Sequence, residues 1–362
     1  MRARALCSSL LCVVLACGAS PVQEGGETSQ GDGDGDASGD GDGDPSGGGD
    51  GDPSGDGDGD PGQSFVFASG FEPGTQIQDI DDLFGDIIGE DLSVAGPSDW
   101  EGDLEGGLFG EFRVYYEGGT LDQRELRLGV DPEDDQNQVL EFILRAPNVA
   151  VVDDDEVACN DPGEERKGRI QAVLRQNANL RQLDYSVRMR LDGGFVLLSG
   201  ADTPITWLTV AEFWNNLPGQ DFSFRVTMNL NKLDAAVGTP LSWGLHGQTN
   251  DGDGWEDVWT HETEPAEIPV PLGEWFELHV GLVEGDAETG RVQVSMDYAG
   301  ASYEIIDRAV YTYHPDDPAP DGLNDLNPLK LYTSGPLLCA VADAGESLVV
   351  RWDDLVIHSA SD

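Results

Sequence analysis

Positive charge is scarce in this sequence. Its 362 residues include 19 lysines and arginines against 70 aspartates and glutamates, which gives a formal net charge of −51 at pH 7. A surface of this kind repels phosphates, so the composition argues against nucleic acid as a partner. The few basic residues are unevenly spread, and a group of them falls within one short stretch: Arg166, Lys167, Arg169, Arg175, Arg181, Arg188 and Arg190.

Long apolar stretches are also scarce. Near the N-terminus, Arg2 and Arg4 precede an apolar stretch from Leu6 to Ala16. That stretch is too short to span a bilayer, which takes about 20 residues. A charged start followed by a short apolar stretch is typical of a signal peptide, so we expect residues 1–16 to be removed on export.

The end of this stretch reads Val14-Leu15-Ala16-Cys17-Gly18 and resembles the lipobox of bacterial lipoproteins. The resemblance implies that Cys17 receives a lipid and becomes the mature N-terminus. Gly18 in place of Asp implies the outer membrane. We therefore expect a chain that is lipid-anchored at the outer membrane or cell surface, and the alternative is an ordinary signal peptide that is cut nearby.

Cysteine is rare, with five in the chain. Cleavage before Cys17 would remove Cys7 and Cys12, and lipid would occupy Cys17 itself. Cys159 and Cys339 then remain in an oxidising compartment, which predicts a disulfide between them. The alternative is two buried free thiols.

Residues 17–63 consist almost entirely of Gly, Asp, Ser and Pro. A segment without large apolar side chains cannot offset the entropy of ordering itself, so we expect a disordered tether. Its alternating aspartates are similar in spacing to a calcium loop, but no Glu stands where such a loop closes.

Residues 64–362 are long enough to bury a substantial core. Apolar and polar residues alternate with a period of two in Leu183–Leu191 and in Phe222–Asn229, which indicates strands. Many short strands of this kind predict one all-β domain, a jelly-roll sandwich of two antiparallel sheets. A single short helix is expected at Ile80–Ile88.

Three of the expected strands carry large polar side chains on one face. They contain Arg169-Ile-Gln171, Glu212-Phe-Trp214 and Lys330-Leu-Tyr332. With these stretches and with Phe65–Thr75, the chain resembles the concanavalin A-like jelly rolls, and within them the polysaccharide lyases of the alginate-lyase and heparin-lyase kind. The resemblance implies that these polar side chains line one groove, with Trp214 where the family has its catalytic His.

Lyase chemistry removes a proton beside a uronate carboxylate, so cations must neutralise that carboxylate while a base and an acid move protons. His314 and Tyr332 are the candidates for proton transfer. The candidates for binding are Arg169, Gln171, Arg188, Glu212, Trp214, Arg225 and Lys330. A hydrolase would need two opposed carboxylates, and only Glu212 is a good candidate.

Three functions stay open at this point. The first is binding of an acidic polysaccharide in a concave groove, the second is a polysaccharide lyase, and the third is a non-catalytic surface-coat or scaffold protein. No cofactor is required by any of them. Calcium is an alternative at one acidic stretch that partly matches an EF-hand loop; its candidate ligands are Asp251, Asp253, Asp257 and Glu262.

Overall fold

The computed structural model describes residues 63–360, apart from 106–108, 151–158, 160–165, 178, 203, 235 and 251–253. The predicted signal peptide, Cys17 and the predicted tether therefore lie outside the described residues, as do Asp251 and Asp253. Within the described part, no helix is both long enough and apolar enough to cross a membrane.

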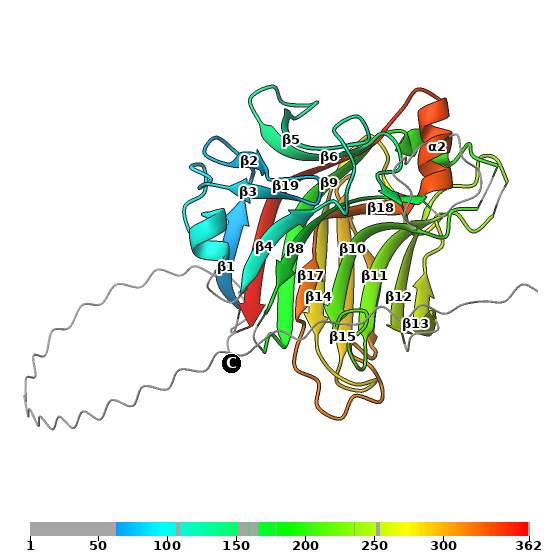
Figure 1. Cartoon of the computed structure of the whole chain (residues 1–362). Coiled ribbons are helices and arrows are strands. Elements are labelled where there is room, and N and C mark those ends of the chain that lie inside the picture. The colour runs from blue at the N-terminus through cyan, green and yellow to red at the C-terminus, as the bar shows by residue number, and fades with distance from the viewer. Residues whose placement is uncertain are drawn as a thin grey trace, which may run out of the picture. The chain divides into compact units, whose positions relative to one another are not determined.

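Two antiparallel sheets pack face to face (Figure 1). In the first, sheet I, the strands follow one another in the order β16 (Ala301–Ala309), β15 (Arg291–Tyr298), β14 (Trp275–Val283), β9 (Gln182–Gly193), β19 (Leu348–Ala360), β6 (Gln138–Leu144) and β5 (Arg124–Val130). Strand β1 (Gln63–Ser69) also pairs with β19. Sheet I thus joins the two ends of the domain.

Sheet II has the strand order β13 (Trp255–Glu262), β12 (Ser242–Asn250), β11 (Phe224–Asn231), β10 (Leu208–Asn215), β17 (Asp325–Asn327), β8 (Arg166–Arg175), β4 (Glu111–Tyr115), β3 (Phe84–Ile88) and β2 (Gln76–Asp79). Strand β18 (Lys330–Ser334) follows β17 and also lies between β10 and β8. A short strand, β7 (Val149–Ala150), pairs with β8. The prediction of an all-β sandwich of two antiparallel sheets is confirmed.

The core lies between the sheets and follows the period-two pattern. On β9, the alternate residues from Leu183 to Leu191 are at most 3% exposed, while the residues between them are partly exposed. On β11, Phe224, Val226 and Met228 point into the core in the same way. These two strands therefore present their polar side chains on the outer face of the sandwich.

Helices are short and lie at the margins of the sheets. They are a π-helical turn, η1 (Trp100–Leu104), a single α-helical turn, α1 (Phe195–Leu198), and α2 (Gly335–Asp343). The helix expected at Ile80–Ile88 is wrong, because Phe84–Ile88 forms strand β3, in which Gly85 and Ile87 are buried and the residues between them are not. Cys159 and Cys339 form a disulfide that ties α2 to the segment before β8, with 5.3 Å between their Cα atoms.

Candidate functional site

Strand β18 brings three distant parts of the chain together in sheet II. Tyr332 is the cross-strand partner of Arg169 on β8 and of Thr209 on β10. Thr209 in turn pairs with Asn229 on β11. Because directly opposed residues share a face, these four side chains form one row across the outer face of the sheet.

A second row runs beside the first. Lys330 is the partner of Gln171 on β8. On the other side of β18, and on the same face of the sheet, Glu212 on β10 pairs with Thr227 on β11, and Thr227 pairs with His246 on β12. Strands that are separate in the sequence thus place charged, amide and hydroxyl groups side by side.

These rows surround a pocket of about 400 Å³, which we call the Tyr332 pocket. Its lining residues are Lys167, Thr206, Trp207, Thr209, Arg225, Thr227, Asn229, His246, Gln248, Trp255 and Tyr332. They comprise two cations, four aromatic rings if the imidazole is included, and several hydroxyl and amide groups. Among the residues that the structure describes, no carboxylate belongs to this lining, although the chain has 70 acidic residues.

Three cations surround the ring of Tyr332. The guanidinium carbon of Arg169 lies 4.2 Å from the ring centre, and the ammonium nitrogens of Lys330 and Lys167 lie 5.0 and 5.6 Å from it. Trp207 packs against the same ring edge-on, with 4.7 Å between the ring centres. Cations near a ring face are attracted by its quadrupole, and here they also concentrate positive charge beside the phenol.

Glu212 is the buried counter-ion of this cluster. It is 3% exposed, its carboxylate accepts from Lys330 Nζ, and its Oε1 lies 3.0 Å from Arg225 Nη1. Burial alone would raise its pKa, but the charges of Lys330 and Arg225 overcome this and hold the pKa of Glu212 at about 2. The carboxylate is therefore ionised at any physiological pH and is not a proton donor.

Lys330 is completely buried. Burial lowers its pKa to about 8; the Glu212 charge opposes the shift, while Arg169 and Arg225 add to it. Burial also lowers the pKa of Arg225, against the effect of Glu212. For Arg169, burial is outweighed by Tyr332 and Glu117, so its pKa is raised. Among the described residues, the carboxylates that form ion pairs with these two lysines and two arginines are Glu212 and Glu117, so the ion-paired group is net positive.

Arg225 links the cluster to an aromatic wall. Its guanidinium carbon lies 3.6 Å from the centre of the Trp255 ring, and its Nε donates to Gln248 Oε1 at 2.9 Å. Trp214 packs edge-on against Trp255, with 5.4 Å between the ring centres.

Two polar atoms next to the pocket, Arg169 Nε and Gln171 Oε1, have no hydrogen-bond partner among the described residues.

The structure brings most of the sequence-predicted residues together here: Arg169, Gln171, Glu212, Trp214, Arg225, Lys330 and Tyr332. Sequence reasoning missed His246, whose Nδ1 lies 3.2 Å from Asp257 Oδ1. It also missed the walls that Trp207 and Trp255 form. The available signal was the alternation along β12, in which Trp243 and Leu245 face the core and His246 lies on the polar face.

His314 is not brought to the cluster. It is buried, its Nδ1 accepts from the backbone N–H of Asp316 at 3.1 Å, and its ring packs against Phe222. Phe222 precedes β11, seven residues from Asn229, and a strand rises about 3.3 Å per residue. The Phe222 end of β11 is therefore on the order of 20 Å from the row that holds Tyr332.

Arg188 lies on a different sheet. It projects from β9 of sheet I, where its Nη1 donates to Asp353 at 2.9 Å and to Asp354 at 3.3 Å. Its guanidinium carbon is 4.8 Å from the centre of a Trp275 ring. It compensates acidic residues on sheet I and does not face the Tyr332 pocket.

The EF-hand interpretation does not fit β13. Asp257 and Glu262 stand five residues apart on this extended strand, which separates them by roughly 16 Å. A single Ca²⁺ binds oxygens at only about 2.3–2.6 Å. Asp257 instead contacts His246 and Gln248, while Glu262 accepts from Asn231 and Ser242.

Comparison with known proteins finds likeness only among solved structures. No protein family matches the chain, and neither does any curated protein. The marine PL-14 alginate lyase from Aplysia kurodai is 8% identical, with 82% of this chain and 99% of that chain covered and a TM-score of 0.43. The endo-beta-1,4-glucuronan lyase from the fungus Trichoderma reesei is 12% identical, with coverages of 69% and 95% and a TM-score of 0.36. The exoplasmic/lumenal domain of VIP36 bound to Ca²⁺ and Man2 is 11% identical, with coverages of 54% and 72% and a TM-score of 0.32.

Proposed function

We propose that this domain binds an acidic, uronate-containing polysaccharide in the Tyr332 pocket. The observation that carries the proposal is the composition of the pocket: its described lining residues include cations and no carboxylate, on a chain with a net charge of −51. A polyanion is repelled by most of such a surface. The Tyr332 pocket offers it a local site of opposite charge.

The geometry accounts for the other parts of a sugar. Trp207 and Trp255 provide flat apolar surfaces on which a pyranose ring packs, and Gln248 and Asn229 provide amides for its hydroxyl groups. The carboxylate of the sugar is received by Lys167 and Arg225. The volume of about 400 Å³ lies within the range of ordinary ligand pockets.

The test is calorimetric titration of the full-length protein with polyuronate oligosaccharides and with neutral oligosaccharides of the same length. We expect binding of the uronates only, and weaker binding as salt rises because screening acts on exposed charges. Lys167→Ala should weaken it. Arg291→Ala removes one charge from sheet I and should not. Equal affinity for the neutral sugars would overturn the acidic specificity.

A second function is favoured by one specific arrangement. The Tyr332 phenol, surrounded by cations, and the His246 imidazole, oriented by Asp257, face the same pocket. In a β-elimination, a base removes the proton next to the uronate carboxylate, the bond to the leaving glycosidic oxygen breaks, and a carbon–carbon double bond forms. The leaving oxygen takes a proton from an acid. Tyr332 and His246 are the two groups placed to exchange these protons.

Ultraviolet absorbance separates the two functions, because the double bond of the product absorbs and an intact polyuronate does not. Growth of absorbance that is abolished in Tyr332→Phe makes the protein a lyase. Binding without absorbance leaves a carbohydrate-binding module. Neither binding nor cleavage, tested over acidic and neutral glycans, leaves the surface-coat or scaffold function.

We further propose that the domain is held at the outer membrane or cell surface by lipid on Cys17. The support is the Leu15-Ala16-Cys17-Gly18 sequence and the Gly- and Asp-rich stretch that follows it. Mass spectrometry of the mature N-terminus tests this proposal. A mature chain that starts anywhere other than at an acylated Cys17 contradicts it.

A further inference from the structure

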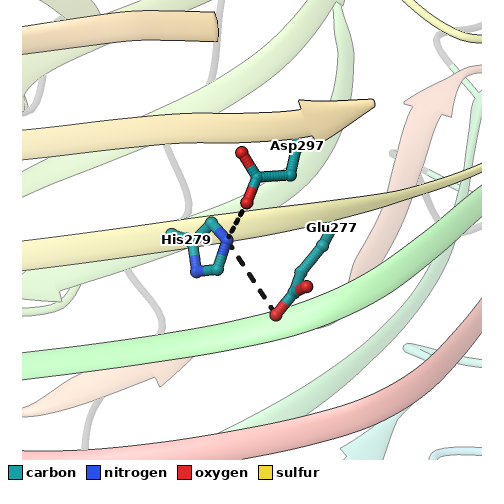
Figure 2. Close-up of side chains that lie close together, drawn as sticks. All are labelled: Glu277, His279 and Asp297. Carbon is teal, nitrogen blue, oxygen red and sulfur yellow. Dashed lines mark hydrogen bonds and ion pairs between the residues drawn. The ribbon is translucent and has the colours of Figure 1, made fainter. Parts of the chain in front are cut away.

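A histidine and two carboxylates converge on the outer face of sheet I (Figure 2). Glu277 and His279 lie two residues apart on β14, so their side chains share a face. Asp297 on β15 is the cross-strand partner of Glu277. One ring nitrogen and one oxygen from each carboxylate all lie within 4.8 Å of one another.

The distances between these atoms resemble those of a coordination sphere. His279 Nε2 is 3.2 Å from Asp297 Oδ2 and 3.9 Å from Glu277 Oε1. Tetrahedral Zn²⁺ binds nitrogen and oxygen at about 2.0–2.2 Å, so adjacent ligand atoms lie roughly 3.3–3.5 Å apart. Small rotations of these partly exposed side chains span the difference. We propose that Glu277, His279 and Asp297 bind a divalent cation of the Zn²⁺ class.

Charge balance favours a cation over a simple ion pair. Both carboxylates approach the same ring nitrogen of His279 (Figure 2), and that nitrogen carries at most one proton. Arg188 is the cross-strand neighbour of Glu277 on β9, but its guanidinium donates to Asp353 and Asp354. A divalent ion neutralises Glu277 and Asp297 together.

The surroundings leave room for a further ligand. His279 lines a pocket of about 580 Å³ on this face, and Asp297 lines a neighbouring one of about 420 Å³. Ser302 lines both pockets and is the cross-strand partner of Asp297. Residues beside a metal ligand help to fix the orientation of that ligand. Three protein ligands leave the fourth position open to a small molecule. The imidazole favours Zn²⁺-class ions over Ca²⁺ and Mg²⁺.

The test is calorimetric titration of chelator-treated full-length protein with ZnCl₂, in excess CaCl₂ to occupy sites made of oxygen alone. We expect one ion per chain, bound at least about tenfold more weakly by His279→Ala, Asp297→Asn and Glu277→Gln. His358→Ala is the matched control, because His358 lines the same pocket as His279 without belonging to the triad; it should bind like the wild type.

Cobalt gives a second readout. Co²⁺ in the site should show the visible absorption of a four-coordinate ion, and His279→Ala should lose it. Wild-type protein that binds no Zn²⁺, or binds it as His279→Ala does, overturns the site. If Asp297→Asn loses Zn²⁺ affinity and His279→Ala does not, the ion is not of the Zn²⁺ class. If His358→Ala loses Zn²⁺ affinity, the proposed set of ligands is wrong. The result is independent of whether the Tyr332 pocket binds sugar.

Discussion

The guanidinium carbon of Arg169 lies 4.2 Å from the centre of the Tyr332 ring, and the two residues are direct cross-strand partners on β8 and β18. The same guanidinium contacts Glu117 Oε2 through its Nη1 at 2.9 Å. Arg169 therefore fixes the tyrosine while it adds positive charge beside the pocket.

The first prediction concerns Arg169. Arg169→Ala should weaken polyuronate binding at least about tenfold, because a charge-assisted contact contributes about 1.5–3 kcal/mol. Arg169→Lys keeps the charge but loses the planar stacking surface, so we expect intermediate affinity. Calorimetry measures both. Wild-type affinity in Arg169→Ala would show that the sugar does not reach this cation.

The second concerns Glu212. Glu212→Gln leaves the buried Lys330 and the partly buried Arg225 without their counter-ion, and breaking a buried ion pair costs about 3–5 kcal/mol. We expect a lower midpoint in denaturant unfolding. Glu304→Gln, which removes an exposed carboxylate from sheet I, is the control and should change the midpoint little.

The stabilisation that Glu212 provides should also depend on pH. The pKa of Glu212 is about 2 in the folded state against an ordinary 4.5, so its stabilising effect is complete above pH 4.5 and is lost as the pH falls towards 2. The stability difference between the wild type and Glu212→Gln should shrink over this range. A constant difference would contradict the assignment.

The third concerns Lys330. Burial lowers its pKa to about 8, so it is charged below this pH and neutral above it. Affinity for a polyuronate should fall as the pH rises from 7 to 9, because the site loses one positive charge. Lys330→Arg holds its charge throughout and should show a flat profile. The same decline in both proteins would assign the effect to another group.

The fourth concerns the disulfide. Cys159 and Cys339 are 180 residues apart in the sequence, and closing so long a loop stabilises by up to about 5 kcal/mol. Replacing both cysteines with alanine should lower the free energy of unfolding by about 2–5 kcal/mol. Wild-type protein with reductant should behave like the double variant. Unchanged unfolding would show that the bridge constrains little.

The fifth separates two histidines. If the protein cleaves polyuronates, His246→Ala should abolish the growth of absorbance. His314→Ala should leave the rate of correctly folded protein unchanged, because His314 lies beyond the far end of β11. Circular dichroism confirms folding in each case. If folded His314→Ala loses cleavage and His246→Ala does not, His314 is the catalytic histidine.

Strand identity was the part of the fold that the sequence predicted well. The alternation predicted for Leu183–Leu191 matches the burial pattern of β9, because one face of that strand packs into the core and the other faces solvent. The segment Ile80–Ile88 was misjudged, since its apolar residues fit both periods and pairing of β3 with β2 and β4 decided the outcome. Phe222 was assigned to the start of a strand, yet it is 37% exposed and has a positive φ of 58°.

The site was predictable only in part. Arg169, Glu212, Lys330 and Tyr332 were found because each stands on the polar face of its own strand. Their neighbours depend on which strands pair, and His246 entered the site through β12, which no local pattern connects to β18. Register between distant strands is a property of the assembled sheet, and one sequence does not specify it.

The position of β18 between β8 and β10 determines when the Tyr332 pocket forms during folding. These strands occupy residues 330–334, 166–175 and 208–215, so Tyr332 meets Arg169 and Thr209 only after the chain has closed loops of more than a hundred residues. Contacts of this separation form slowly and late in folding. A chain shortened before residue 330 never acquires the Tyr332 pocket, because it lacks β18. Any function of this pocket therefore requires that the whole domain has folded first.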